Sequence, residues 1–372
     1  MLLRRPPRPK MKRLLSASIV PLALNSMFAC RVSEPIIRVP HELAEPLPEA
    51  VAADVDMDGD TLARMTSELP PPAEHGLRSA LVMRRGRLVL EQYWNGYDQA
   101  AQQDLRSATK SITSLLVGIA IDQQLIKGVG EPLSSFLAPV YPTLPSLKRN
   151  ITLAHLLTMR SGLACNDRDE GSPGQEDKMY RERDWVRFFL ELPSLGPPGE
   201  AAFYCTGGAV TLGRVIAEAA RRPVSTFAEE LLFAPLGIQG ARWATFDDRR
   251  QTDTGGHLAL RPRDMMRIGL LVLQRGRWGE RQLVSREWID QSTSEHTQLD
   301  GGKSYGYLWW RTTFPHRGRQ VSAIFAGGNG GQYIFVIPDL ELVAVFTGGN
   351  YNSKRAQRPF RLLERYVLPA VR

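Results

Sequence analysis

A serine and a lysine stand three residues apart in the segment Ser107-Ala108-Thr109-Lys110. Three residues make close to one helical turn, so the two side chains can touch if a helix begins here. A serine alcohol is a poor nucleophile at neutral pH, and acyl transfer requires a neighbouring group that takes its proton. Lysine can do this only as a neutral amine, which burial and the positive end of a helix dipole both favour. The spacing is therefore compatible with a covalent serine hydrolase.

The alternative interpretation of these four residues is purely structural. Ser107 or Thr109 would then cap a helix, and Lys110 would be a solvated cation, because a motif with two fixed positions occurs by chance in many chains. The sequence that follows is strongly apolar from Ser111 to Ile126 and ends in Lys127-Gly128, a typical helix terminus. We therefore predict a buried helix over 111–126 with the serine and lysine at its start.

Further segments follow in a fixed order along the chain. They are Ser79–Glu91, Ile151–Leu163, Pro198–Thr206, Pro235–Ile238, Gly255-Gly256, Arg263-Asp264 and Tyr305–Trp310. Together with Ser107 and Lys110, they resemble the serine hydrolases related to class C β-lactamases, penicillin-binding DD-peptidases, carboxylesterases and 6-aminohexanoate-dimer hydrolases. The resemblance extends over most of the chain.

The resemblance implies a role for each residue of a catalytic group. Ser107 would be the nucleophile, Lys110 its proton partner, and Tyr204 the second member of the general-base pair. A phenol has an ordinary pKa of about 10, so a tyrosine acts as a base only if a nearby cation stabilises its phenolate or shares its proton. Lys110 is the candidate cation. Taken alone, Tyr204 reads as a half-buried aromatic residue.

A third motif is expected in the glycine-rich segment that precedes a strand, Gly328-Asn329-Gly330-Gly331-Gln332. By resemblance, these glycines let a substrate acyl group lie close to the backbone. The N–H of Gly331 would join the N–H of Ser107 in binding the oxyanion. The alternative is a plain glycine turn between two strands.

Two departures from the family pattern concern the substrate. In the second motif, the hydroxyl of Thr206 replaces the asparagine amide that usually holds a substrate's acylamino group, and would face the substrate in its place. In the third motif, Gly328 stands where β-lactamases carry a lysine. The cation that would pair with a β-lactam carboxylate is therefore missing, which disfavours efficient β-lactam hydrolysis. A small or neutral ester or amide fits better, with Trp309, Trp310 and Tyr305 either lining the site or belonging to the sheet core.

We therefore expect an exported serine hydrolase that cleaves small ester or amide bonds through an acyl-enzyme on Ser107. A DD-peptidase or weak β-lactamase acting on peptidoglycan-like amides is the second hypothesis. The third is a non-catalytic protein that binds cell-wall fragments or a partner. The chain contains no GxSxG, P-loop or HExxH motif, and its histidines lack ligand spacing, so neither a metal nor another cofactor is expected. Only His257, after Gly255-Gly256, stands out, and we expect it to be structural.

The N-terminus reads as an export signal over residues 1–30. The chain has a net charge of +8, and six basic residues lie in its first fourteen positions, so the remainder has only a slight excess and nucleic-acid binding is not expected. An apolar run from Leu14 to Ala29 is interrupted by Pro21 and too short for a membrane-spanning helix. It ends in an imperfect lipobox at Cys30. Lipidation there, with membrane anchoring, and export without a lipid both stay open.

Two cysteines remain, Cys165 and Cys205. In an oxidising periplasmic or cell-envelope compartment, an even pair suggests a disulfide, which would join the loop after Leu163 to the residue beside Tyr204. Free buried thiols are the alternative. The charged loop 166–183 is long for a connector and lacks a regular pattern, which is typical of loops that carry specificity.

The element pattern predicts an α+β fold. Strands are expected at 80–84 and 87–94, joined by a hairpin at Arg85-Gly86, and again at 305–312, 321–325, 333–337 and 342–346, before a helix at 359–368. We expect an antiparallel sheet formed by the N- and C-terminal segments, with flanking helices and a mainly helical insert at about 125–262. The hydrolase domain would span 70–372, after a proline-rich leader and first helix at 31–69 in which Asp60 caps the helix Thr61–Glu68.

Overall fold

The computed structural model describes residues 47–143, 146–247 and 251–372. The predicted signal 1–30, including Cys30, and most of the leader therefore lie outside the described residues. Within the described ranges, no helix combines the length and apolar character needed to cross a membrane.

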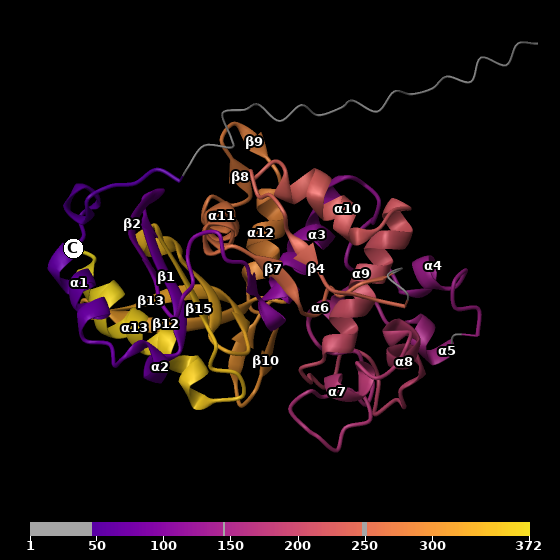
Figure 1. The fold of residues 1–372 in the computed structure, drawn as a ribbon. Coiled ribbons are helices and arrows are strands. Elements are labelled where there is room, and N and C mark those ends of the chain that lie inside the picture. Colours follow the sequence, from indigo (N-terminus) through magenta and orange to yellow (C-terminus); the bar gives the residue numbers. More distant parts are fainter. Residues whose placement is uncertain (1–46, 144–145, 248–250) are drawn as a thin grey trace, which may run out of the picture. The chain divides into compact units, whose positions relative to one another are not determined.

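The centre of the fold is an eight-stranded antiparallel sheet with the strand order β10-β11-β12-β13-β14-β15-β1-β2. Its N-terminal hairpin, β1 (Leu77–Arg84) and β2 (Arg87–Tyr93), turns at Arg85-Gly86 as predicted. The C-terminal strands complete the sheet, because β15 (Leu342–Gly348) pairs with β1 along its length. Segments from the two ends of the chain thus lie side by side (Figure 1), which confirms the predicted fold class.

The other strands of this sheet follow one another along the chain. They are β10 (Thr297–Leu299), β11 (Lys303–Tyr305), β12 (Trp310–His316), β13 (Arg319–Gly328) and β14 (Gln332–Ile337). The predicted strand 305–312 is in fact two strands, because Leu308 adopts a left-handed backbone conformation with φ of 63° between β11 and β12.

Helices cover both faces of the sheet. Successive side chains of a strand point to opposite faces. On β14, Ile334 lies against Gly269 of α11 (Pro262–Leu273), where a methyl group in place of the glycine hydrogen would stand 2.9 Å from Ile334. The next side chain, Phe335, packs on the other face against Phe360 of α13 (Arg358–Leu362), with ring centroids 5.0 Å apart. Both faces are therefore buried, which explains the continuous apolar run of β14.

A mainly helical region lies between the two parts of the sheet, on the right in Figure 1. Its helices are α4 (Ser134–Leu137), α5 (Ser146–Arg149), α6 (Leu153–Leu157), α7 (Glu176–Met179), α8 (Trp185–Glu191), α9 (Thr206–Ala220) and α10 (Val224–Ala228), followed by a π-helical turn over Glu229–Phe233. Two small antiparallel sheets complete it. In a three-stranded sheet, β3 (Gln103–Asp104) and β4 (Arg242–Trp243) flank β7 (Leu258–Leu260), and in a two-stranded sheet β5 (Thr245–Phe246) pairs with β6 (Gln251–Thr252).

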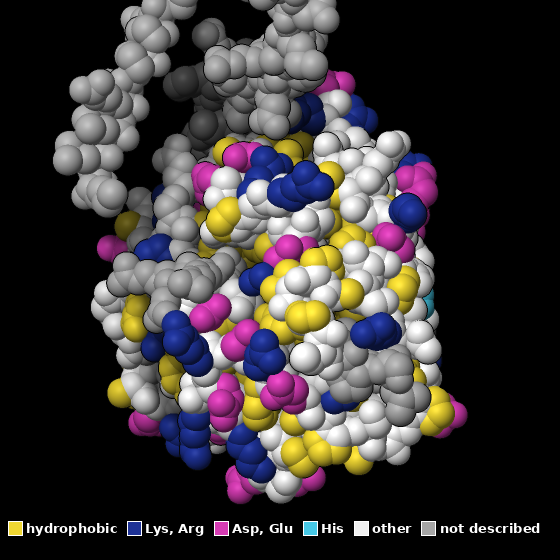
Figure 2. Space-filling model, turned by 90° about the vertical axis from the view of Figure 1, so that its right-hand side faces the viewer, with side chains coloured by type: hydrophobic (Ala, Val, Ile, Leu, Met, Phe, Trp, Pro, Cys, Tyr) yellow, Lys and Arg dark blue, Asp and Glu magenta, His cyan; other side chains and the backbone are white. Residues whose placement is uncertain are grey.

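The surface of this helical side carries mixed charge. Figure 2 views the molecule from that side and shows basic, acidic and apolar side chains interspersed over it. A nucleic-acid-binding face instead presents basic residues gathered in a patch or stripe. The described residues on the face seen in Figure 2 form no such patch, because their basic side chains are interspersed with acidic ones.

Three helix boundaries differ from the sequence prediction. Helix α1 (Gly59–Ser67) is capped by Asp58, which accepts the N–H of Thr61, rather than by Asp60. Helix α3 (Thr109–Asp122) ends before 126, because Gln124 turns into a left-handed conformation and returns the chain to the core at Ile126. The C-terminal helix 359–368 contains a π-helical segment over Leu363–Val367, followed by α14 (Leu368–Ala370). Further elements are helix α2 (Pro72–His75), the hairpin β8 (Arg277–Trp278) and β9 (Arg281–Gln282), helix α12 (Arg286–Thr293), and short 3₁₀ turns over Ala52–Val55, Pro338–Leu340 and Lys354–Gln357.

Candidate active site

Ser107 lies in a 3₁₀ turn over Arg106–Ala108, directly before helix α3. Two hydrogen bonds fix the start of this turn. The N–H of Leu105, the residue before the turn, donates to the carbonyl of Leu258, and the N–H of Arg106 donates to Asp104 Oδ1 at 2.8 Å. The helix behind it is buried almost throughout, as its apolar sequence predicts. Ser107 is thus presented at the start of a rigid element.

Lys110 is one helical turn farther along, and its side chain is 1% exposed. Its Nζ lies 3.2 Å from Ser107 Oγ, 3.0 Å from Thr206 Oγ1 and 2.6 Å from the carbonyl oxygen of Gly255. The serine and lysine therefore touch inside the protein, which excludes the alternative of a solvated lysine. An amine in this position can exchange a proton with the serine hydroxyl.

Tyr204 lies near Lys110, just before helix α9, and its side chain is 5% exposed. Two cations lie near its ring. Lys110 Nζ is 5.1 Å from the ring centroid, and Arg168 Cζ is 4.7 Å from it. The structure therefore gathers Ser107, Lys110 and Tyr204 around one amine and adds a second cation, Arg168, which the sequence did not reveal.

Thr206 connects Lys110 to two carboxyl groups. Its Oγ1 lies 2.7 Å from Asp167 Oδ2 and 2.9 Å from Glu176 Oε2, and its backbone N–H donates to the same Asp167 oxygen at 2.7 Å. The side chain is fully buried. The sequence predicted a hydroxyl that faces the substrate, but the structure uses it inside the protein, between the lysine and the acidic pair.

The hydroxyl of Thr206 contacts both carboxyl groups of the acidic pair, Asp167 and Glu176, but carries only one proton. A hydroxyl donates one hydrogen bond, so Thr206 can satisfy only one of the two carboxylates. The other contact requires a proton on a carboxyl group. Burial and the charge of Glu176 raise the pKa of Asp167 to about 6, although Lys110 and Thr206 lower it. Asp167 therefore takes up a proton near pH 6.

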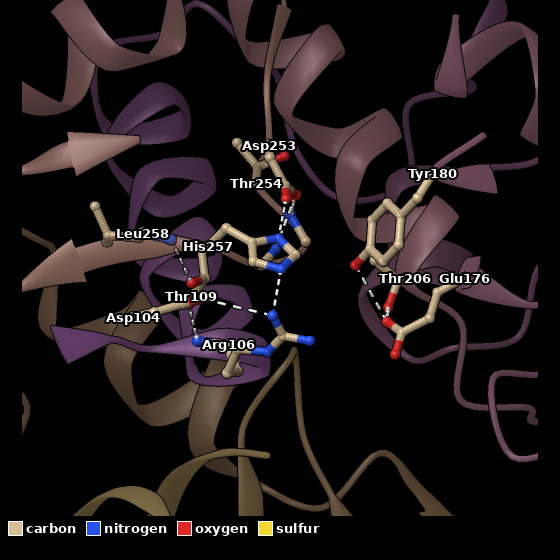
Figure 3. Close-up of polar contacts among 12 residues, drawn as sticks. Asp104, Arg106, Thr109, Glu176, Tyr180, Thr206, Asp253, Thr254, His257 and Leu258 are labelled. Carbon is tan, nitrogen blue, oxygen red and sulfur yellow. Dashed lines mark hydrogen bonds and ion pairs between the residues drawn. The ribbon is translucent and has the colours of Figure 1, made fainter. Parts of the chain in front are cut away.

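Tyr180, the residue that follows helix α7, is hydrogen-bonded to the acidic pair. Its hydroxyl donates to Glu176 Oε2 at 3.3 Å (Figure 3). Burial, with the nearby charge of Glu176, raises the pKa of Tyr180 far above its ordinary value, so this tyrosine stays protonated and acts as a donor. Asp167, Glu176 and Tyr180 all come from the charged loop 166–183, which the sequence marked as a specificity loop without identifying them.

A disulfide holds this loop against the second motif. Cys165 and Cys205 are bonded, with their Cα atoms 5.5 Å apart, and they are 40 positions apart in the sequence. Beside the disulfide, the N–H of Asp167 donates to the carbonyl of Tyr204 at 2.8 Å. The covalent link therefore fixes Asp167 and Tyr204 next to each other.

The glycine-rich third motif lies against the serine turn. At Gly328, a methyl group would stand 2.1 Å from the carbonyl oxygen of Leu105 and 3.2 Å from the N–H nitrogen of Ala108, so only glycine fits. Gly331 has a φ of 102°, and its N–H donates to the carbonyl of Gly328 at 3.3 Å. The predicted oxyanion donor is thus engaged in its own turn.

Contacts with residues 350–352 fix the remainder of this motif. The side chains of Asn329 and Asn352 are 2.7 Å apart, and Asn329 Oδ1 accepts the N–H of Asn352. The carbonyl of Gly330 accepts the N–H of Asn350 at 3.0 Å. These bonds use the side chain of Asn329 and the carbonyl of Gly330, so the turn is held independently of any substrate.

The predicted aromatic lining is rearranged. Trp309 is fully buried and has no exposed surface for a substrate to touch. Its neighbour Trp310 instead stacks on Tyr204 with ring centroids 5.7 Å apart, and Tyr305 packs edge-on against Trp310. The two tryptophans therefore differ in environment, and Trp310 is the one beside the candidate site.

Comparison with known proteins finds relatives over most of the chain. The chain is 24% identical over 313 residues to a 6-aminohexanoate-dimer hydrolase from Paenarthrobacter ureafaciens, which covers 77% of this chain and 76% of that protein. A solved structure described as a putative 6-aminohexanoate-dimer hydrolase from Bacillus anthracis superimposes with a TM-score of 0.70 at 19% identity, covering 88% of both chains.

Two further structures share the fold. EstCE1, described as a hydrolase with promiscuous acyltransferase activity, gives a TM-score of 0.66 at 16% identity and covers 83% of this chain and 99% of its own. A penicillin-binding protein from Bacillus halodurans gives 0.62 at 18% identity, covering 78% and 98%. The family described as Beta-lactamase matches residues 57–366 of this chain. The chain therefore belongs to the beta-lactamase family, with the fold of its hydrolases and penicillin-binding protein homologues.

Proposed function

We propose that this protein is an exported serine hydrolase that cleaves a small ester or amide through an acyl-enzyme on Ser107. The observation that carries the proposal is the buried contact of 3.2 Å between Lys110 Nζ and Ser107 Oγ at the start of helix α3. The proximity of Tyr204, and membership of a family that includes hydrolases, support the same assignment.

In acylation, the Ser107 oxygen attacks the substrate carbonyl carbon while its proton passes to neutral Lys110. The carbonyl π electrons move to the oxygen and form an oxyanion. As the carbonyl reforms, the bond to the leaving alcohol or amine breaks, and a proton delivered through Tyr204 and Lys110 neutralises the leaving group. The product of this step is an ester on Ser107.

In deacylation, water attacks the ester carbon and gives its proton to the same base pair. The bond to Ser107 Oγ then breaks, the serine recovers its proton, and the carboxylic acid leaves. Two backbone N–H groups would bind each oxyanion. We propose that Ser107 supplies one and the turn 328–331 the other. The N–H of Gly331 donates to the carbonyl of Gly328 in this structure, so it would have to leave that bond to serve as the second donor.

The substrate is proposed to lack the recognition carboxylate of a β-lactam. No side chain fits at Gly328, so a cation cannot stand at that position of the third motif. The relatives include a 6-aminohexanoate-dimer hydrolase and a hydrolase with promiscuous acyltransferase activity, and Trp310, which stacks on Tyr204, suits a small apolar acyl group.

The first experiment is active-site labelling of the purified protein. A fluorophosphonate probe should label the wild type on Ser107, identified by peptide mass spectrometry, and a Ser107→Ala variant should not label. Ser111→Ala is the matched control, because it removes a serine hydroxyl from the same helix that only donates to the carbonyl of Leu308. No labelling of the wild type would favour a non-catalytic binding protein.

Substrate class is tested by turnover. Short-chain nitrophenyl esters should be hydrolysed faster than a chromogenic cephalosporin. The reverse order would favour the weak β-lactamase or DD-peptidase. Tyr204→Phe should slow ester hydrolysis about 100-fold, since proton transfer by one positioned group contributes at least that much. Wild-type activity in this variant would remove Tyr204 from the mechanism.

Export is tested separately. The disulfide between Cys165 and Cys205 fits an oxidising compartment. The full chain expressed in a Gram-negative host should fractionate with the periplasm or membranes, and mass spectrometry should identify the mature N-terminus. A diacylglyceryl group on Cys30 that is lost in Cys30→Ser would establish a lipoprotein, whereas a soluble mature chain would establish export without a lipid.

A further inference from the structure

A second buried carboxylate lies on the other side of the serine turn. Asp253 is fully buried, and its Oδ1 accepts the N–H groups of Gly255 and Gly256 at 3.0 and 2.9 Å. Its Oδ2 lies 2.7 Å from Nδ1 of His257. The carboxylate thus folds the segment 253–257 around itself.

The contacts of His257 fix its tautomer. Asp253 accepts backbone N–H groups on one oxygen, so the ring Nδ1 facing the other oxygen is a donor. On the opposite side, His257 Nε2 lies 2.6 Å from Arg106 Nη1 (Figure 3). A guanidinium has no acceptor, so Nε2 must carry the lone pair. His257 is therefore a neutral bridge that accepts from Arg106 and donates to Asp253.

Arg106 is the residue before the candidate nucleophile, and its backbone is in the left-handed region, with φ of 51°. A residue with a side chain is disfavoured there and persists only when its surroundings hold it. His257 shares this feature, with φ of 57°. The bridge joins the two strained residues to each other, and Asp104 adds a 3.5 Å ion pair to Arg106.

The same segment also reaches the lysine. The carbonyl of Gly255, whose N–H is held by Asp253, accepts Lys110 Nζ at 2.6 Å. On the next residues, the N–H of Leu258 donates to Thr109 Oγ1 at 3.2 Å. One turn organised by one carboxylate thus contacts the residue before Ser107, the residue before Lys110 and Lys110 itself.

We infer that the segment Asp253–Leu258 is the positioning element of the nucleophile, and that His257 holds Ser107 in its reactive orientation through Arg106. Asp253 and His257 are positioning residues in this scheme, because they touch neither the serine oxygen nor a substrate. The inference rests on the proposed function, since it supposes that Ser107 reacts.

The test is a double-mutant cycle on the maximal rate of labelling by a fluorophosphonate. His257→Ala and Arg106→Ala should each slow labelling roughly 10- to 100-fold, the range expected when a reacting atom is displaced by about 1 Å. Because the two residues act through one contact, the double variant should be no slower than the slower single variant. Multiplied losses would overturn the inference.

A conservative variant separates positioning from packing. His257→Gln retains a donor and an acceptor on one short side chain and should recover at least several-fold of the rate lost in His257→Ala. The control is His316→Ala, which removes a buried ring at the end of β12 remote from Trp310 and should label at the wild-type rate. Equal rates for His257→Ala and wild type would overturn the inference.

Hydrogen exchange gives a readout that does not depend on catalysis. In His257→Ala, peptides that cover residues 104–110 should exchange faster than in the wild type, while those from β14 should not change. Unchanged exchange in 104–110 would overturn the inference even if the wild type labels. If the wild type does not label but this exchange difference is present, the proposed function fails and the positioning contact stands.

Discussion

Two polar networks contact the proposed catalytic residues from two sides, and they differ in how completely the hydrogen-bonding capacity of their carboxyl groups is satisfied. On the turn 253–258, Asp253 binds two backbone N–H groups and one imidazole. On the disulfide-linked loop, Asp167 binds Thr206 through Oδ2, whereas its buried Oδ1 has no hydrogen-bond partner among the described residues.

The difference teaches how one kind of side chain serves two purposes. A carboxylate whose acceptors are all satisfied fixes the geometry of its surroundings, because every bond would be lost on rearrangement. A carboxyl group that is buried with an unmet acceptor is costly to ionise, and its pKa rises. We therefore infer that the network of Asp253 fixes the geometry around Ser107 and Lys110, whereas the network of Asp167 controls the charge around Lys110. The following predictions, from the largest effect to the smallest, can break this division.

Lys110 is where the two networks meet, through Gly255 and Thr206. Lys110→Met keeps the length of the side chain and removes the amine. We expect the rate of fluorophosphonate labelling to fall about 1,000-fold, within the usual range for the loss of a general base. Thermal melting should check that the variant folds. Retention of more than a tenth of the wild-type rate would show that neither network acts through the lysine.

A variant of Thr206 tests the network of Asp167 separately from that of Asp253. Thr206→Val removes the hydroxyl that joins Lys110 to Asp167 and Glu176 while keeping the shape of the side chain. We expect labelling to slow about 10-fold, because the variant leaves a buried acceptor unpaired near the lysine. Thr206→Ser, which retains the hydroxyl, is the matched control and should stay within about twofold of wild type. A similar loss in both variants would point to packing instead of the hydrogen bonds.

Removal of the disulfide tests what holds the loop 166–183, which carries Asp167 and Glu176. A loop of 40 residues is closed by Cys165 and Cys205, and the chain-entropy account assigns such a loop about 4 kcal/mol. The double variant Cys165→Ala/Cys205→Ala should therefore melt roughly 5 to 10 °C lower. Hydrogen exchange should rise in 166–183 but not in 253–258. Equal loosening of both segments would contradict the separation of the two networks.

Asp167 gives a pH dependence with a defined sign. Its pKa is raised from 3.8 to about 6 in the folded protein, first by burial and then by Glu176. The folded protein therefore takes up this proton before the unfolded chain does, so the destabilising effect of the ionised group is present above pH 6 and is relieved as the pH falls towards 4. The effect is at most about 3 kcal/mol.

Denaturant titrations at several pH values check this dependence. The stability of Asp167→Asn relative to wild type should be greater at pH 7 than at pH 4, because the amide has no charge to bury. Asp169→Asn, on the same loop but exposed, is the control and should show no such difference. A difference that grows as the pH falls would mean that the folded protein stabilises ionised Asp167.

The contact between Ser107 and Lys110 could be predicted from sequence because it is local. The two residues share one helical turn, and the apolar run behind them marks the helix as buried. The fold was predictable for a similar reason: strands at both ends with helices between them leave few ways to cover a sheet. Tyr204 was reached only through resemblance to a family.

The tertiary structure decided which polar groups surround the lysine. Asp167, Glu176 and Thr206 meet because the disulfide and helix α9 bring distant segments together, and no periodicity in the sequence encodes that meeting. For the same reason, Thr206 faces inward instead of towards a substrate.

His257 and Arg106 are 151 positions apart, so their contact likewise depends on how the turn 253–258 packs against the start of α3. The sequence by itself determined the fold class and the proximity of Ser107 and Lys110, since helical spacing and hydrophobic patterning act over a few residues. Which carboxylate fixes geometry and which one titrates was decided by long-range packing, because burial and hydrogen-bond satisfaction exist only once the chain has folded.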